Sequence, residues 1–322
     1  LIDGLGFEQF ENSEEKGLVP NLTTFSKRRI HTVAPTTTAT ALTSLTTGKS
    51  PGEHGVVGYK IRTGNQILNA LRWTTGHGSA VNEINPASFQ PVEPFFGSAP
   101  PIVSPAQFQE SGFSSAHLRG GDYLGYWLPS SMPVLINDSL KSGANFVYSY
   151  YDGLDKVGHI HGINDFYDAE VRFIDDLIGK ILACVPNGTA LIVTADHGLV
   201  DVDDSLVTLE TAATDLATAL SGEARFLWFH SKRGAEAELV EILEQLYSQN
   251  GWIRTRDQVL DEGWFGKQVS TIANSRLGDV ALVARNPVAF VPAGKEGPKL
   301  KARHGSLTPA ESYVPLMTML KA

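Results

Sequence analysis

The chain of 322 residues has 42% hydrophobic and 19% charged residues, which is typical of a globular protein with one large α/β domain or two smaller ones. Its formal charge of −9 argues against binding to a nucleic-acid duplex, because phosphate backbones attract basic surfaces. The single cysteine, Cys184, excludes an intramolecular disulfide and a cysteine cage for a metal, and no apolar run is long enough to span a membrane.

The elements up to about residue 200 alternate between strands and helices. Apolar runs that end in polar residues predict buried strands in LID at the start, NFVYSYYD from Asn145 and TALIVTADHG from Thr189. An apolar stripe at helical spacing predicts a helix over 166–182. This alternation predicts an α/β fold with a mostly parallel sheet and helices on both faces. The Gly-, Pro- and Ser-rich residues 64–133 are expected to form long loops around a site.

The threonine-rich stretch PTTTATALTSLTTGKS, from Pro35, predicts a loop that turns into a helix. Thr38 would then lie near a helix N-terminus, where free N–H groups and the helix dipole favour an anion. The other threonines are expected to cap and pack the helix. Gly48-Lys49-Ser50 matches the end of a P-loop, but that motif needs a glycine where Thr43 stands and a strand directly before it. A P-loop nucleotide-binding module is therefore a remote alternative.

Residues 205–275 are predicted to form a small α+β insertion that lies over the main sheet as a lid. The stretch RFLWFH, from Arg225, predicts a strand, 235–247 an amphipathic helix, and WIRTRDQVL, from Trp252, a strand and a turn. The core would comprise 1–204 and 276–322, and the chain would rejoin it at the strand GDVALVARNPVAFV, from Gly278.

Aspartates and histidines gather at the predicted strand ends or beside glycine. The candidate metal ligands are Asp3, Asp155, His159, Asp196, His197 and His304. The carboxyl ends of strands in an open α/β sheet are where ligands bind. Three aspartates and three histidines suit zinc or manganese, and six ligands fit two ions better than one. The remaining histidines are interpreted as ordinary surface or core residues: His31, His54, His77, His117, His161 and His230.

The segments LIDGLG, PTTTATALTSLTTG, YDGLDKVGHIHG, TADHGL and RHG occur in this order over residues 3–305. Together they resemble the alkaline phosphatase superfamily and, within it, the type I phosphodiesterase/nucleotide pyrophosphatase family. The resemblance implies an alkaline-phosphatase-like core with two Zn²⁺ ions, Mn²⁺ being the alternative. One ion would be held by Asp155, His159 and His304. The other would be held by Asp3, Asp196 and His197.

The same resemblance implies that Thr38 is the nucleophile and that its oxygen completes the second metal site, with Thr37 as the alternative if the register differs by one. The implied substrate is a small phosphate ester, cleaved at a phosphodiester or nucleotide pyrophosphate bond through a covalent phospho-threonine. A phosphonoacetate hydrolase-like C–P hydrolase and a phosphomonoesterase of the same superfamily are the alternatives.

One position departs from the family. An asparagine that helps to hold the phosphoryl group is expected shortly after the His-Gly that follows the nucleophile's helix, and Tyr59 stands there. A phenol donates one hydrogen bond where an amide offers two. Tyr59 is thus a candidate substrate contact, and Asn65 or Asn69 could substitute for the amide from the following loop. Because of this departure, the sequence does not define which group leaves from phosphorus.

The chain opens inside a predicted strand and not on a methionine, so we expect that upstream sequence has been removed. We take the cytoplasm as the default compartment. A secreted or periplasmic location stays open, because a signal peptide would have been removed with that segment.

Overall fold

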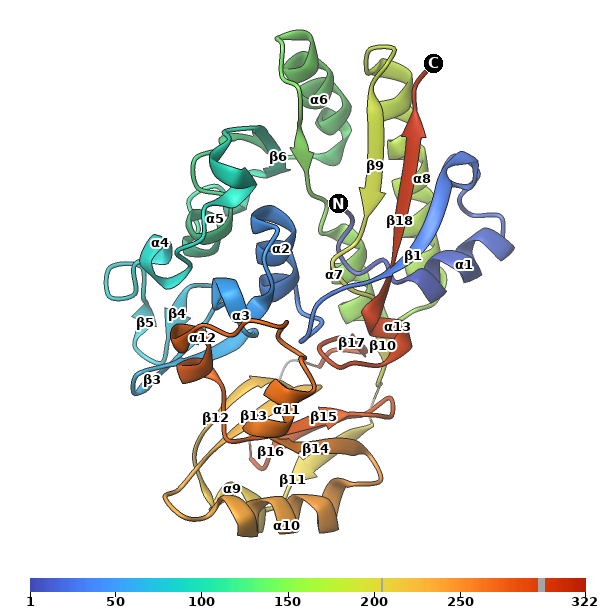
Figure 1. Ribbon diagram of the computed structural model, residues 1–322. Coiled ribbons are helices and arrows are strands. Elements are labelled where there is room, and N and C mark those ends of the chain that lie inside the picture. The colour runs from blue at the N-terminus through green and yellow to red at the C-terminus, as the bar shows by residue number, and fades with distance from the viewer. Residues whose placement is uncertain (204, 295–298) are drawn as a thin grey trace.

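The main sheet is mostly parallel. A computed structural model describes residues 1–203, 205–294 and 299–322 (Figure 1). The sheet contains β1 (Ser26–His31), β6 (Pro101–Pro105), β7 (Asp122–Tyr126), β8 (Tyr148–Ser149), β9 (Ala190–Thr194) and β18 (Tyr313–Leu320). β6 pairs in parallel with β7 and β8, and Ile2 forms parallel bridges to Tyr151 and Ala195. β18 runs antiparallel between β9 and β1, so the predicted α/β class is confirmed with one reversed strand.

Helix α8 (Asp165–Cys184) packs on one face of this sheet, as the stripe over 166–182 predicts. Asn164 begins the helix by accepting a hydrogen bond from the N–H of Phe166, at 3.0 Å. Val171 and Ile174 are buried in one cluster with Ile2 of the sheet. The same cluster receives side chains from α1 (Phe7–Glu15), α6 (Met132–Lys141) and α7 (Gly153–His161).

The opposite face of the sheet is covered by α2 (Thr38–Thr47) and α5 (Gly112–His117). Tyr150 belongs to the cluster on this face, whereas its neighbour Tyr151 belongs to the cluster under α8. Successive side chains of a strand point to opposite faces, so the two tyrosines mark the two sides of the sheet. The predicted helices on both faces are therefore present.

Three threonines of α2 form hydrogen bonds to backbone carbonyls of the same helix, whereas the buried hydroxyl of Thr40 has no partner among the described residues. Thr43 donates to the carbonyl of Ala39 at 2.7 Å, and Thr46 and Thr47 make equivalent bonds to carbonyls four residues earlier. Such bonds let a hydroxyl be buried at little cost. Gly48 ends the helix with a φ of 65°. Gly48-Lys49-Ser50 thus follows a helix and precedes α3 (Pro51–His54), which excludes a P-loop.

Residues 64–133 do not form long loops, and that prediction was wrong. They include β6, β7 and α5, together with α4 (Pro86–Phe89) and three of the four strands of a small sheet. The small sheet contains β2 (Lys60–Thr63), β3 (Gln66–Asn69), β4 (Thr74–Thr75) and β5 (Gly78–Ser79). β6 and β7 are short and contain proline and glycine, which weakens the sequence signal. Their place beside β8 in the sheet decides their conformation.

A second, antiparallel sheet lies at the end of the molecule opposite to the C-terminus (Figure 1). Its strands are β12 (Ala217–Glu223), β13 (Phe226–Ser231), β14 (Gly251–Thr255) and β15 (Val280–Ala284). β13, β14 and the helix α10 (Glu236–Tyr247) confirm the predicted elements. The turn expected after Trp252 is instead the helix α11 (Arg256–Asp261), which Thr255 and Gln258 begin with a capping box.

The strand predicted from Gly278 is β15, and it lies between β13 and β14 rather than in the main sheet. β11 (Leu206–Leu209) pairs with β16 (Ala289–Pro292), and β10 (Val200–Asp201) with β17 (Ala302–Arg303). The other helices are α9 (Thr211–Thr214), α12 (Thr271–Arg276) and α13 (Pro309–Ser312). Among the described helices, none has the length and apolar character to cross a membrane. The division into a core and an insertion of 205–275 stays a proposal.

The second sheet shares its inner face with the main body. Phe226 and Trp228 of β13 lie in the same buried cluster as Ala39 and Leu42 of α2. On the outer face of the sheet, Leu227 and its neighbours pack against α10. A lid that moved as a separate body would have to expose Trp228, which is 2% exposed. This face therefore restrains any independent movement.

His54 ties α3 to the middle of α2. Its Nδ1 accepts a hydrogen bond from the N–H of Val56 at 3.1 Å, and its Nε2 lies 2.8 Å from the hydroxyl of Ser44. Burial lowers the pKa of His54 to about 3. The ring is thus neutral in the folded protein, whereas an unfolded chain protonates it below about pH 6.5.

We predict that the free energy of unfolding falls as the pH drops below about 6.5, because the unfolded state binds the proton first. His54→Asn should reduce this loss by about 1.4 kcal/mol per pH unit between pH 6 and 4. Urea unfolding at several pH values, in the presence of a chelator, measures how steeply the free energy of unfolding changes with pH in the wild-type protein and in the variant. Equal slopes for the two proteins would show that His54 is not neutral in the fold.

Candidate metal centre

The six predicted ligands meet at the carboxyl edge of the main sheet. Asp3 follows Ile2, which lies between Tyr151 and Ala195, and Asp196 follows Ala195. α7 begins just beyond Tyr151 and carries Asp155. His304 follows β17. The structure therefore brings together side chains that are separated by up to 301 positions in the sequence, as adjacent strand ends require.

Asp3, Asp196 and His197 form one group, in which the ligand atoms lie within 4.8 Å of one another. The Nε2 atom of His197 lies 3.3 Å from Oδ1 of Asp3 and 3.4 Å from Oδ2 of Asp196. The Oγ1 atom of Thr38 lies 3.2 Å from the same Nε2 atom. This is the set of residues that the resemblance implies for the second ion.

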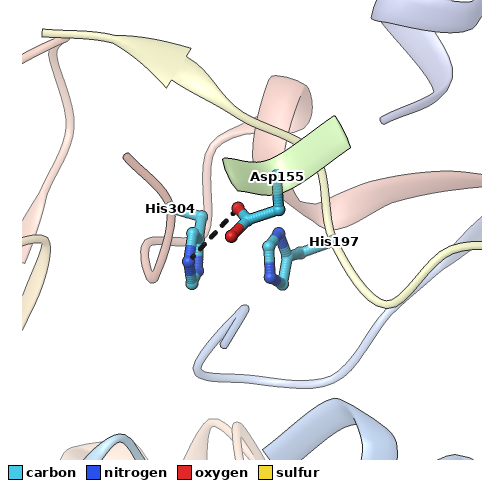
Figure 2. A group of neighbouring side chains, drawn as sticks. All are labelled: Asp155, His197 and His304. Carbon is cyan, nitrogen blue, oxygen red and sulfur yellow. Dashed lines mark ion pairs between the residues drawn. The ribbon is translucent and has the colours of Figure 1, made fainter. Parts of the chain in front are cut away.

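Asp155 is the centre of the neighbouring group. Its Oδ2 lies 3.3 Å from Nε2 of His159, and its Oδ1 lies 3.9 Å from Nε2 of His304. The group within 4.8 Å contains Asp155, His197 and His304 (Figure 2), where the resemblance has His159 in place of His197. The rings of His197 and His304 stack at 3.7 Å between centroids, so the two groups adjoin.

All three histidines are held in one tautomer. Each Nδ1 faces a backbone carbonyl, which can only accept, so each Nδ1 carries the proton. The carbonyls belong to Ala302 for His159 at 2.8 Å, Gly198 for His197 at 3.2 Å and Thr36 for His304 at 2.8 Å. In the neutral rings the Nε2 atoms therefore present lone pairs to the carboxylates. This is the usual arrangement of metal-binding histidines.

The carboxylates lack partners where they face these lone pairs. Oδ1 of Asp3, Oδ1 of Asp155 and Oδ2 of Asp196 are buried without a hydrogen bond to any described residue. Burial, followed by the charge of Asp196, raises the pKa of Asp3 well above its usual value. Burial likewise lowers the pKa of His197 and that of His304. Lone pairs facing buried oxygens at these distances are unfavourable unless a proton or a metal ion lies between them, and three carboxylates with three imidazoles are a donor set that fits divalent metal ions.

Other residues hold the ligands in place. The hydroxyl of Tyr150 donates to Oδ2 of Asp3, and the N–H of Gly4 donates to Oδ1 of Asp196 at 3.2 Å. Gly4 has a φ of 77°, and a Cβ there would lie 3.1 Å from the Cα atom of Asp155. Glycine thus lets the first strand end close to α7.

Thr37 and Thr38 differ in their contacts. The Thr38 hydroxyl points to the Asp3 group, whereas the Thr37 side chain makes no cap hydrogen bond at the start of α2. Glu223, at the end of β12, lies at the edge of the site, with its Oε2 3.9 Å from Nδ1 of His304. Burial raises the pKa of Glu223 to about 8. Sequence reasoning missed Glu223, because no motif surrounds it.

A pocket of about 190 Å³ opens beside Thr38, Asp3 and Asp155. Its wall contains several residues that the sequence did not single out: Ser104, Phe108, Ser111, Phe113, Ser114, His117, Tyr148, Tyr150 and Lys156. His117, interpreted as an ordinary histidine, is buried, and burial lowers its pKa to about 4. For this wall, the sequence offered one signal: Tyr148 and Tyr150 alternate in NFVYSYYD, and alternate residues of a strand point to the same face of the sheet.

Tyr59 lies apart from these residues. Its hydroxyl accepts a hydrogen bond from Nδ2 of Asn69 at 2.7 Å. Neither residue is among the described residues that line the pocket. A role for Tyr59 in substrate binding stays a prediction.

Comparison with known proteins agrees with this geometry. The sequence profile of the family described as type I phosphodiesterase/nucleotide pyrophosphatase matches residues 1–133 and 124–307. The chain therefore belongs to this family of phosphohydrolases. A search of curated proteins gave no match.

Two solved structures show how widely the fold is shared. Phosphonoacetate hydrolase from Sinorhizobium meliloti 1021, in complex with phosphonoformate, superposes with a TM-score of 0.75 at 15% identity over 98% of this chain and 88% of that one. Murine ectonucleotide pyrophosphatase/phosphodiesterase 5 superposes with a TM-score of 0.73 at 16% identity over 98% of this chain and 86% of that one. At these identities the likeness shows the fold alone.

Asp196→Asn tests the metal centre. The amide keeps the acceptor at Oδ1 and removes one buried charge, so without metal the midpoint of thermal unfolding should rise by about 3 °C, the shift for about 1 kcal/mol. Zinc should stabilise the variant less than the wild-type protein, because a ligand is lost. Calorimetry with zinc and with chelator measures both effects, and the exposed Asp122→Asn is the control. An unchanged response to zinc would contradict the assignment of Asp196.

Proposed function

We propose that this protein is a two-zinc hydrolase of phosphodiesters or nucleotide pyrophosphates that uses Thr38 as its nucleophile. The observation that carries the proposal is the set of three Nε2 lone pairs that face buried carboxylate oxygens beside the Thr38 hydroxyl. Bound zinc supplies Lewis-acid charge for the phosphoryl oxygens and favours loss of the Thr38 proton, and Mn²⁺ is the alternative ion.

The ligands proposed for one ion are Asp3, Asp196 and His197. Those for the other are Asp155, His159 and His304, with His197 close enough to contribute. Thr38 is preferred to Thr37 because its hydroxyl lies 3.2 Å from Nε2 of the proposed ligand His197. Oγ1 of Thr38 forms a bond to phosphorus as the bond from phosphorus to the leaving oxygen breaks. Water then cleaves the phospho-threonine and restores the hydroxyl. The inactive threonine-to-alanine variant of the murine neighbour, solved with AMP, is consistent with this role.

The pocket favours an uncharged group on the substrate. Among its described lining residues, Lys156 is the one cation, and it already forms an ion pair with Asp152. A substrate with a carboxylate, such as phosphonoacetate, would compete with Asp152 for Lys156 and would face the charge of Asp155. The hydroxyl and aromatic side chains of the wall suit a neutral organic group better.

We predict that Thr38→Ala lowers kcat by at least about a thousandfold, because a lost nucleophile is not replaced by its neighbours. The zinc content of the variant should match that of the wild-type protein. Thr38→Ser, which keeps a hydroxyl, should retain measurable turnover. Hydrolysis of bis-p-nitrophenyl phosphate and metal analysis provide the two readouts, and full activity of Thr38→Ala would overturn the mechanism.

A substrate panel separates the alternatives. With the zinc-loaded protein, kcat/KM for bis-p-nitrophenyl phosphate should exceed that for phosphonoacetate by about a hundredfold or more, the discrimination expected when a charged group lacks a free partner. p-Nitrophenyl phosphate reports the monoesterase alternative. If acetate release were faster and Lys156→Gln abolished it, the protein would be a C–P hydrolase.

A further inference from the structure

His117 is a buried polar residue in the wall of the pocket beside Thr38. It is the last residue of α5, which packs beside α2 (Figure 1). The residue is 3% exposed, and its ring stacks on that of Phe113, with 4.0 Å between centroids and 21° between planes. This packing holds the imidazole ring in one plane, so the directions of its two nitrogen atoms are fixed as well.

One nitrogen of this ring already has a partner within α5. Nδ1 lies 2.7 Å from the backbone carbonyl oxygen of Phe113, which can only accept a hydrogen bond. Nδ1 therefore carries the proton of the neutral ring, and Nε2 carries a lone pair. Burial lowers the pKa of His117 to about 4, so the ring is neutral at pH 7.

The other nitrogen, Nε2, is an acceptor without a partner. Among the described residues, none forms a hydrogen bond or an ion pair with it. His117 shares its tautomer with the three histidines of the metal centre, but neither group of candidate metal ligands that the described residues form contains it. A buried acceptor that has lost water without gaining a donor costs free energy. A ligand that supplies a donor would therefore be favoured at this place.

This acceptor makes the pocket selective for hydrogen-bond donors. Of the uncharged wall residues, Phe108 and Leu118 are apolar, whereas Ser104 and Tyr148 have hydroxyl groups that both donate and accept. The hydroxyl of Tyr148 is buried and has no partner among the described residues. In its fixed tautomer, Nε2 of His117 can only accept. It therefore distinguishes a ligand with an O–H or N–H group from a ligand of the same shape that lacks one.

We propose that His117 is a specificity-determining residue, whose Nε2 accepts a hydrogen bond from an O–H or N–H group on the organic part of the substrate. The substrate class is thus a phosphodiester whose uncharged organic group carries a hydrogen-bond donor. This inference rests on the proposed function, because it places that organic group in the pocket beside Thr38.

Two matched substrates test the preference for a donor. p-Nitrophenyl phenyl phosphate is prepared with a hydroxymethyl or an ethyl group on the phenyl ring, at the meta or the para position. The two groups have nearly the same shape, but only the first has a donor. With the zinc-loaded protein, kcat/KM for the hydroxymethyl diester should be about tenfold higher in at least one position, an effect of the size of one hydrogen bond. Chromatography of the two aryl phosphates formed in a competition assay gives this ratio independently of the concentration of active enzyme.

Variants of His117 assign the preference to its Nε2 atom. His117→Phe removes the acceptor and keeps an aromatic ring against Phe113, so the ratio should fall to about one or below, because an apolar wall favours the ethyl group. His117→Gln, whose amide oxygen accepts, should restore part of the preference. His117→Leu serves if the phenylalanine variant does not fold. The exposed His77→Phe is the matched control and should keep the wild-type ratio.

Two results would overturn the proposal. One is a wild-type ratio of one or below at both ring positions. The other is a preference for hydroxymethyl that persists in His117→Phe, which would assign the contact to another group such as the Tyr148 hydroxyl. If the wild-type protein cleaves neither diester, the proposed function is wrong. Calorimetric titration with the corresponding benzylphosphonates, in which a methylene group replaces the ester oxygen, would then still compare the two groups at His117.

Discussion

The site depends on the tautomer of three histidines. Backbone carbonyls of Ala302, Gly198 and Thr36 take the Nδ1 protons, so the Nε2 lone pairs are turned toward buried carboxylates. Without a cation this arrangement is repulsive, and burial makes the repulsion larger. Folding energy from the two flanking clusters must offset it. The metal-free protein is therefore expected to be strained at the place where the bound ions stabilise it.

The candidate ligands could be singled out because each lies at a place that local sequence marks. Asp3, Asp196 and His197 follow apolar runs, and Asp155 and His159 share a helix face. Thr38 was singled out by the spacing to Thr47-Gly48 in the family that the chain resembles, and its place at a helix N-terminus agreed with that choice. These signals are local, and the ends of adjacent strands then bring the side chains together.

Other features could not be predicted, because they depend on which segments become neighbours. The sequence of β15 indicates a strand but does not say which sheet it joins. The apolar sequence of β18 predicts a strand but does not indicate that it runs antiparallel to its neighbour β9. The pocket wall draws Ser104, His117 and Tyr148 from separate elements with no shared motif. Glu223 ends a strand of the second sheet, and only the packing of that sheet brings it to His304.

The buried face that the second sheet shares with α2 links the two halves of the chain in their stability. Trp228 and Leu42 belong to one buried apolar cluster, so both lose packing contacts if either sheet opens. Opening the second sheet would therefore cost a large part of the free energy of global unfolding. Amide hydrogens of β13 and of α2 should then exchange through a common cooperative event. The strand β13 of the second sheet should thus be as protected from exchange as α2, the helix that carries Thr38.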